Sequence, residues 1–167
     1  MSDVDVRIKT TLLEQAVKVL KGTMYVKVGI QGSKGNKIHP GTKDDKTPLP
    51  VWKVGEIHEY GRPDLGIPQR SFLHWPLEDD FSVRWHELFG KKEIQEVFLK
   101  SKFAFFKTIA KAAMAVIDEA FQREGSSARK WQALNPQYAN KKGSTKILVD
   151  TATMRRAISY RIVRGDD

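Results

Sequence analysis

The side chains that could bind a metal or perform catalysis are few and widely spaced in this sequence. The 167 residues include no cysteine and only four histidines, at positions 39, 58, 74 and 86. Without thiolates, disulfide scaffolds, zinc–thiolate sites, iron–sulfur clusters and thiol nucleophiles are excluded. His58-Glu59 begins like the helical zincin motif, but Arg62 occupies the place of the second histidine. We therefore expect His58 to be a helix-surface or interface residue rather than a metal ligand.

Patterns typical of phosphate binding or acyl transfer are also incomplete. The glycines at 29, 32 and 35 are evenly spaced and do not match the G-x-G-x-x-G turn. Lys142 precedes Gly143-Ser144, which reverses the Walker order, and no G-x-S-x-G elbow occurs. Glu56 and Glu59, about one helical turn apart, are more typical of a charged surface than of an acid–base pair. The sequence thus predicts a protein that is not an enzyme and has no metal or cofactor.

The positive charge is concentrated in the second half of the chain. The net charge is +9, with 13 basic and 12 acidic residues in 1–90 but 16 and 8 in 91–167. A basic patch is predicted from Arg129, Lys130, Lys141, Lys142 and Lys146, with Trp131 and Tyr138 interleaved. Such a patch could contact phosphates and stack on bases, or meet an acidic protein, or be a solvated surface. No helix-turn-helix, zinc-finger or ribonucleoprotein signature accompanies it.

The overall composition indicates one globular domain spanning residues 1–167. The length fits a single domain, and 40% hydrophobic with 29% charged residues is a globular balance. No stretch approaches 18 uncharged apolar residues, so we expect no membrane span. The acidic start lacks the apolar core of a signal peptide, so we expect a soluble protein of the cytoplasm.

Hydrophobic periodicity predicts the elements that must position these side chains. Helices are expected at about 11–21, 50–60, 76–90 and 93–123, followed by a short one ending at Arg156. Strands are expected at 24–30 and about 158–163. The predicted class is α+β, with a long central helix and shorter helices packed on a small antiparallel sheet. Residues 31–50, rich in glycine, proline and lysine, are expected to form a long mobile loop that orders on assembly.

Three blocks of sequence, taken in order, are similar to one family. The first is the strand ending VGI at 28–30, and the second is IHEYG at 57–61 with IPQRSFL at 67–73. The third is WQALNP at 131–136, a basic turn, and ILVDTATMRRAIS at 147–159. Together they resemble the virion-morphogenesis or tail-completion proteins of tailed bacteriophages, the Mu-like group especially.

Two positions depart from that family. Ser71 stands where the family often has proline, and Ala152 stands where it often has glycine. A left-handed turn would strain an alanine, so we expect the local backbone at Ala152 to differ from that of the family.

The resemblance implies a structural role rather than an activity. Such proteins complete the tail or join it to the filled head, and we expect a sixfold homo-oligomeric ring at the virion neck. Neighbours would include tail-terminator, tail-tube or head-completion proteins, with transient contact to phage DNA passing through the ring. Ring contacts are heterologous, so one patch meets a different patch on the next subunit.

Six residues are candidates for the assembly interface: Arg70, Phe72, Trp131, Asp150, Arg155 and Arg156. Arg70 is expected to pair with Asp150 or Glu59, because a guanidinium can hold a carboxylate bidentately. Phe72 is expected to fill a pocket either in its own core or on a neighbour. For Asp150 a helix N-cap is favoured over an intersubunit bridge.

Overall fold

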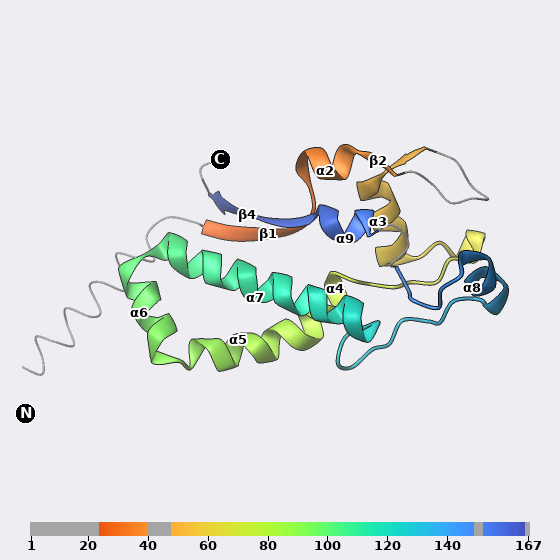
Figure 1. Ribbon diagram of the computed structural model, residues 1–167. Helices are drawn as coiled ribbons and strands as arrows, with labels where there is room; N and C mark the ends of the chain where they lie inside the picture. Colours follow the sequence, from red (N-terminus) through yellow and green to blue (C-terminus); the bar gives the residue numbers. More distant parts are fainter. Residues whose placement is uncertain (1–23, 40–47, 149–151, 166–167) are drawn as a thin grey trace, which may run out of the picture.

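A long helix, α7, forms the centre of the fold, with a two-stranded sheet on one side and two shorter helices on the other (Figure 1). The computed structural model describes residues 24–39, 48–148 and 152–165. The expected α+β class is confirmed. The described elements are β1 (Met24–Ile30), α2 (Gly32–Asn36), β2 (Ile38–His39), β3 (Leu49–Pro50), α3 (Val51–Tyr60), η1 (Pro63–Leu65), α4 (His74–Pro76), the π-helical turn η2 (Leu77–Phe81), α5 (Ser82–Phe89), α6 (Lys92–Lys100), α7 (Lys102–Arg123), α8 (Pro136–Lys142), α9 (Thr153–Ala157) and β4 (Ile158–Arg164).

The sheet joins the two ends of the described chain. Strands β1 and β4 pair antiparallel from Met24↔Arg164 to Ile30↔Ile158, which confirms both predicted strands and their orientation. Val28, Ile30 and Ile158 pack on the hydrophobic core. Since successive residues of a strand point to opposite faces, the residues between them line the outer face of the sheet.

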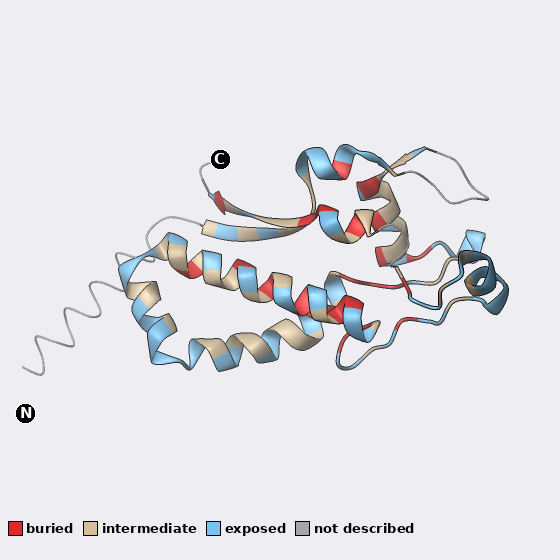
Figure 2. Cartoon of the chain, viewed as in Figure 1, coloured by how far each residue is buried: buried red, intermediate tan, exposed pale blue. Residues whose placement is uncertain are grey.

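The predicted continuous helix over 93–123 is wrong, because the chain breaks at Ser101. Ser101 has an extended backbone (φ −155°, ψ 109°), and its Oγ accepts a hydrogen bond from the Ala104 N–H at 3.2 Å. Serine is a preferred N-cap, so it ends α6 and starts α7. The break folds α6 back onto α7, where Phe98 packs edge-on against Phe105 with 4.8 Å between ring centroids. Buried residues follow α7 along its length (Figure 2).

The segment 31–50 contains more structure than the predicted mobile loop. Its described residues form α2 and a short antiparallel pair, in which Ile38 lies opposite Pro50 and His39 opposite Leu49. The Val51 N–H also donates to the Lys37 carbonyl at 2.9 Å, so the two ends of the segment are joined. These contacts come from residues adjacent to α3, and composition alone does not reveal them. Positions 40–47 lie outside the described residues.

The shorter helices follow their predicted limits closely. Helix α3 begins after Pro50 and ends at Gly61, while α4, η2 and α5 together cover 74–89. Ala152 does adopt the left-handed conformation, with φ 54° and ψ 8°, so the expected departure of its backbone is wrong. It directly precedes α9, whose Met154 and Ala157 are buried. The predicted helix over 11–21 lies outside the described residues.

None of the helices in the described ranges is both long enough and apolar enough to cross a bilayer. The long helix α7 carries lysines at 102, 107 and 111, which interrupt its apolar surface. Its buried face contacts the sheet on one side and the α5–α6 pair on the other, as Figure 1 shows. It is therefore the central helix of the core, as the sequence predicted.

Candidate functional site

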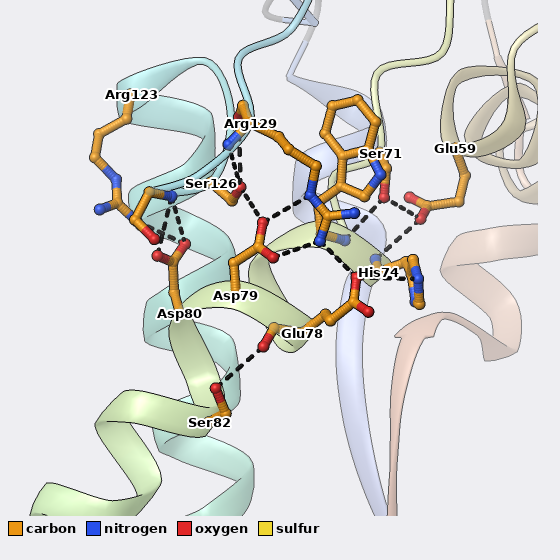
Figure 3. Close-up of polar contacts among 12 residues, drawn as sticks. Glu59, Ser71, His74, Glu78, Asp79, Asp80, Ser82, Arg123, Ser126 and Arg129 are labelled. Carbon is orange, nitrogen blue, oxygen red and sulfur yellow. Dashed lines mark hydrogen bonds and ion pairs between the residues drawn. The ribbon is translucent and has the colours of Figure 1, made fainter.

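Glu59, in the last turn of α3, is a buried carboxylate on which the second sequence block converges. It is only 7% exposed. Its oxygens accept hydrogen bonds from Ser71 Oγ at 2.6 Å and from the His74 N–H at 2.9 Å (Figure 3). The backbone N–H groups of Phe72 and Leu73 donate to it as well, at 2.9 and 3.0 Å. Four donors nearly exhaust what a carboxylate can accept. Glu59 therefore fixes the chain where α4 begins.

Gly61 allows the second block to close on itself. It has φ 76°, a conformation that strains any residue with a side chain. A Cβ at this position would also lie 2.8 Å from the backbone nitrogen of Gln69. The glycine after the helix therefore permits residues 67–73 to lie directly against the end of α3.

Arg70 binds backbone carbonyls rather than a carboxylate. It is 7% exposed, and its Nε donates to the Gln132 carbonyl at 3.0 Å and its Nη2 to the Ala133 carbonyl at 3.4 Å. Burial lowers the pKa of Arg70 from its ordinary value. The predicted pair with Glu59 is wrong, because other donors occupy that carboxylate. The other predicted partner, Asp150, lies outside the described residues.

Trp131 links the second and third blocks from the other side. Its indole Nε1 donates to the Ser71 carbonyl at 2.9 Å, and the residue is 5% exposed. Together with the Arg70 bonds, this contact ties residues 131–133 to residues 70–71. We call Glu59, Arg70, Ser71 and Trp131 the Glu59 cluster. Every side chain in it is buried and bound within the chain.

Phe72 belongs to the core of its own chain. Its exposed fraction is 0%, and its ring lies 5.6 Å from that of Phe121, which in turn lies 5.5 Å from the indole of Trp131. Of the two alternatives for Phe72, core packing therefore holds, and neither Phe72 nor Trp131 presents surface to a neighbour. Arg155 lies over the same Phe121 ring and pairs with Asp118 at 3.0 Å.

A second polar cluster surrounds Arg129, which the sequence assigned to a basic patch. Its Nε donates to Asp79 at 2.8 Å, its Nη2 contacts Asp79 and Glu78, and its guanidinium lies over the ring of Trp75 (Figure 3). Hydrogen bonding to Arg129 lowers the pKa of Asp79, and the same contacts raise the pKa of Arg129. The assignment of Arg129 to an available basic patch is wrong, because two carboxylates neutralise it.

The acidic residues of η2 also bind the loop that follows α7. Ser126, which is fully buried, hydrogen-bonds to Asp79 through its hydroxyl. Asp80 accepts from the Ser127 N–H and from Arg123 Nη2, both at 3.0 Å. We call Glu78, Asp79, Ser126 and Arg129 the Arg129 cluster. His74 borders this cluster, with its Nε2 3.5 Å from Glu78 Oε2, while the Ser126 hydroxyl bonds to Asp79.

The remaining residues of the predicted basic patch differ in their contacts and exposure. Lys130 donates to the Arg123 carbonyl at 3.0 Å, and Trp131 is too buried to stack on a base. Lys141 and Lys146 are exposed near the end of α8, and Arg156 is exposed on α9, while the side chain of Lys142 lies outside the description. No group of three potential metal ligands occurs in the described ranges.

Sequence reasoning missed one exposed pair of cations. The register of the sheet places Lys27 directly opposite Arg161, and both residues are exposed. The alternation of apolar and polar residues along each strand could have placed Lys27 and Arg161 on the outer face. Only the pairing register brings the two together.

The chain has no match among protein-family models, curated proteins or solved structures. What the chain can do therefore has to be argued from its own clusters and surfaces.

Proposed function

We propose that this protein is a non-enzymatic structural component of a tailed-phage virion. It completes the tail or joins it to the head as one subunit of a ring at the neck. The observation that carries the proposal is the Glu59 cluster, in which residues of two blocks that resemble tail-completion proteins bind one another. Residues about 60 positions apart meet in this buried cluster, as parts of one structural motif would.

The chemistry of that cluster favours a scaffold. Glu59 and Arg70, two charged residues of the second block, are both buried with their hydrogen bonds directed at the chain itself. Buried charges satisfied in this way fix a backbone conformation. In this protein the buried charged residues fix the conformation of the loops. A fold made rigid in this way is suited to presenting surfaces to neighbouring subunits.

Helix α3 offers such a surface. Trp52, Glu56 and Tyr60 recur every four residues, and all three are exposed, Tyr60 by 72%. Residues at this spacing share one helical face. Tryptophan and tyrosine are enriched where proteins meet, so this aromatic stripe supports a subunit contact in the ring.

Light scattering after size exclusion and negative-stain imaging of the full chain test the proposal. We expect closed rings, with six copies as the expected number. Tyr60→Ser should shift the distribution toward single chains, because it removes aromatic area from the stripe. Tyr138→Ser is the matched control, since Tyr138 is an exposed tyrosine of α8. A folded wild-type chain that stays monomeric at every concentration would overturn the ring.

The alternative function, a basic nucleic-acid-binding protein, has less support than the sequence suggested. Arg129 is neutralised by Glu78 and Asp79, and Trp131 is buried. A monomer with tight, strongly salt-dependent DNA affinity would favour this alternative over the ring.

A further inference from the structure

The outer face of the β1–β4 sheet holds positive charge that no described carboxylate neutralises. Lys27 and Arg161 lie directly opposite each other and are both exposed. Neither strand contains an aspartate or glutamate. Among residues 24–39, 48–148 and 152–165, neither cation forms an ion pair.

Most of the described arginines, in contrast, are bound within the fold. Five arginines pair with carboxylates within the described structure: Arg62, Arg84, Arg123, Arg129 and Arg155. Directly opposed residues of an antiparallel pair have Cβ atoms only about 4.5–5.5 Å apart, and like charges at that separation destabilise a sheet. A neutral or opposite charge at either position would stabilise the strands better. Folding therefore gains nothing from placing these two cations opposite each other.

The neighbouring side chains shape this face for a charged, extended ligand. Tyr25 lies two residues before Lys27 on the same face, and the Lys27 Nζ is 5.4 Å from the centre of its ring. In the other direction, the next pair on this face is Gly29 opposite Ser159. A Cβ at Gly29 would lie 3.8 Å from Leu73 Cδ1, and the Gln31 side chain donates to the Ser159 carbonyl at 3.1 Å. The surface open to a ligand is therefore the part at Lys27 and Arg161.

We infer that this face binds the phosphate backbone of double-stranded DNA, with Lys27 and Arg161 as the main phosphate contacts. The inference rests on the proposed function, in which DNA passes through the ring. Duplex DNA presents one negative charge per about 1.7 Å of its length, so closely spaced cations meet phosphates at any sequence. Contacts of this kind carry no sequence information, as transient passage of a genome requires.

An acidic protein partner fits this face less well. Stable protein interfaces have a desolvated centre of aromatic or aliphatic side chains surrounded by a polar rim. On the outer face Val163 is buried, and Tyr25 is the one exposed large apolar side chain that the description of β1 and β4 shows. A face of two cations with glycine and serine beside them offers charge without such a centre.

The test is fluorescence anisotropy of a labelled, random-sequence duplex of about 30 base pairs, titrated with the full chain over a range of salt. The double variant Lys27→Gln/Arg161→Gln should bind at least about tenfold more weakly at low salt, and its log K against log salt slope should fall by about 2. The matched control is Lys107→Gln/Lys111→Gln, which removes the same charge from exposed positions of α7. At about 0.15 M salt it should stay within about twofold of wild type, because charges farther than about 8 Å from the contact are then screened.

Three results would overturn the inference. The sheet variant could bind like wild type, or both double variants could lose affinity equally, which would indicate diffuse net charge. The wild type could also bind a poly-glutamate peptide in preference to the duplex, which would indicate an acidic protein partner. Ring formation is measured on the same samples. If the protein forms rings but does not bind DNA, the DNA-binding inference fails and the proposed ring stands. If a monomer binds DNA and the sheet variant weakens that binding, the proposed ring fails and the DNA-binding inference stands.

Discussion

Positive charge is neutralised in the Arg129 cluster but not on the outer face of the sheet. Arg129 is bound by Asp79, Glu78 and the ring of Trp75, although its side chain is 35% exposed, so its charge is neutralised within the chain. Lys27 and Arg161 lie opposite each other on an exposed face with no described carboxylate to pair with. The first arrangement stabilises the fold, whereas the second is unfavourable to it.

The difference shows why counting basic residues locates a binding surface poorly. The carboxylate that neutralises Arg129 lies 50 positions earlier in the chain, on η2. Lys27 belongs to the half of the sequence with almost no net charge, yet it faces Arg161 from the basic half. Which cations remain available to a partner is decided by pairing across the fold. The comparison predicts large losses of stability where a charge is buried and bound, and none where it is exposed and opposed.

The largest expected loss of stability comes from changing the buried carboxylate of Glu59. Glu59→Gln keeps the shape but replaces one acceptor oxygen with an NH2 group that would face backbone N–H donors. We expect the free energy of unfolding to fall by about 2–4 kcal/mol, since donors in the Glu59 cluster lose their acceptor in a buried site. Urea unfolding followed by circular dichroism measures the change.

Glu56→Gln on the same helix is the control for that substitution. Glu56 pairs with Lys53 at 2.9 Å, but both side chains are well exposed. Exposed pairs of this kind contribute well under about 1 kcal/mol. Equal effects of the two glutamine substitutions would contradict the structural role given to Glu59.

An intermediate effect is expected at Arg129, with a dependence on pH. Arg129→Met keeps an apolar stem but removes both ion pairs and the contact of the guanidinium with the Trp75 ring. Because Arg129 is partly exposed, this should destabilise the chain less than Glu59→Gln does. In the folded protein the pKa of Asp79 lies below its ordinary value because Arg129 binds it. This stabilisation is present above the ordinary pKa of an aspartate, about 4, and is lost as pH falls through the lowered value.

The difference in unfolding free energy between wild type and Arg129→Met should therefore narrow as pH falls from about 6 to about 3. Urea unfolding at several pH values measures it. Arg123→Met serves as the comparison, because Arg123 pairs with the neighbouring Asp80. A difference that stays constant with pH would show that the Arg129–Asp79 pair contributes nothing to stability.

Local patterns predicted much of the fold because the forces involved act over a few residues. Alternation identified β1 and β4, and Pro50 with Gly61 marked the limits of α3. The same reasoning joined α6 to α7, since the apolar spacing continues through Ser101 and only its extended backbone separates the helices. A single capping residue can thus override a periodic pattern.

The candidate site was less predictable because its contacts join distant segments. The motif around Glu59 could be recognised, but which donors reach its carboxylate depends on the turn that follows Gly61. Arg70 was expected to seek a carboxylate, whereas the fold brings it to the carbonyls of Gln132 and Ala133. Those partners are backbone groups, which a sequence pattern does not distinguish.

The smallest expected change in the free energy of unfolding is at Arg161. It is also the most discriminating, because this substitution should stabilise the chain whereas the others destabilise it. Arg161→Glu places a carboxylate directly across the sheet from Lys27 and replaces a repulsive pair with an attractive one. We expect the free energy of unfolding to rise by about 0.2–1 kcal/mol at low salt, and the gain to shrink as salt screens the pair. Arg161→Gln should give a smaller gain, since it removes repulsion without adding attraction. If Arg161→Glu instead destabilises the chain, Arg161 is held by a partner within the fold, and the face is not the unneutralised surface that its comparison with Arg129 describes. A rise in stability would mean that the native arginine lowers the stability of the fold. That is expected of a residue whose role is to bind an external anion.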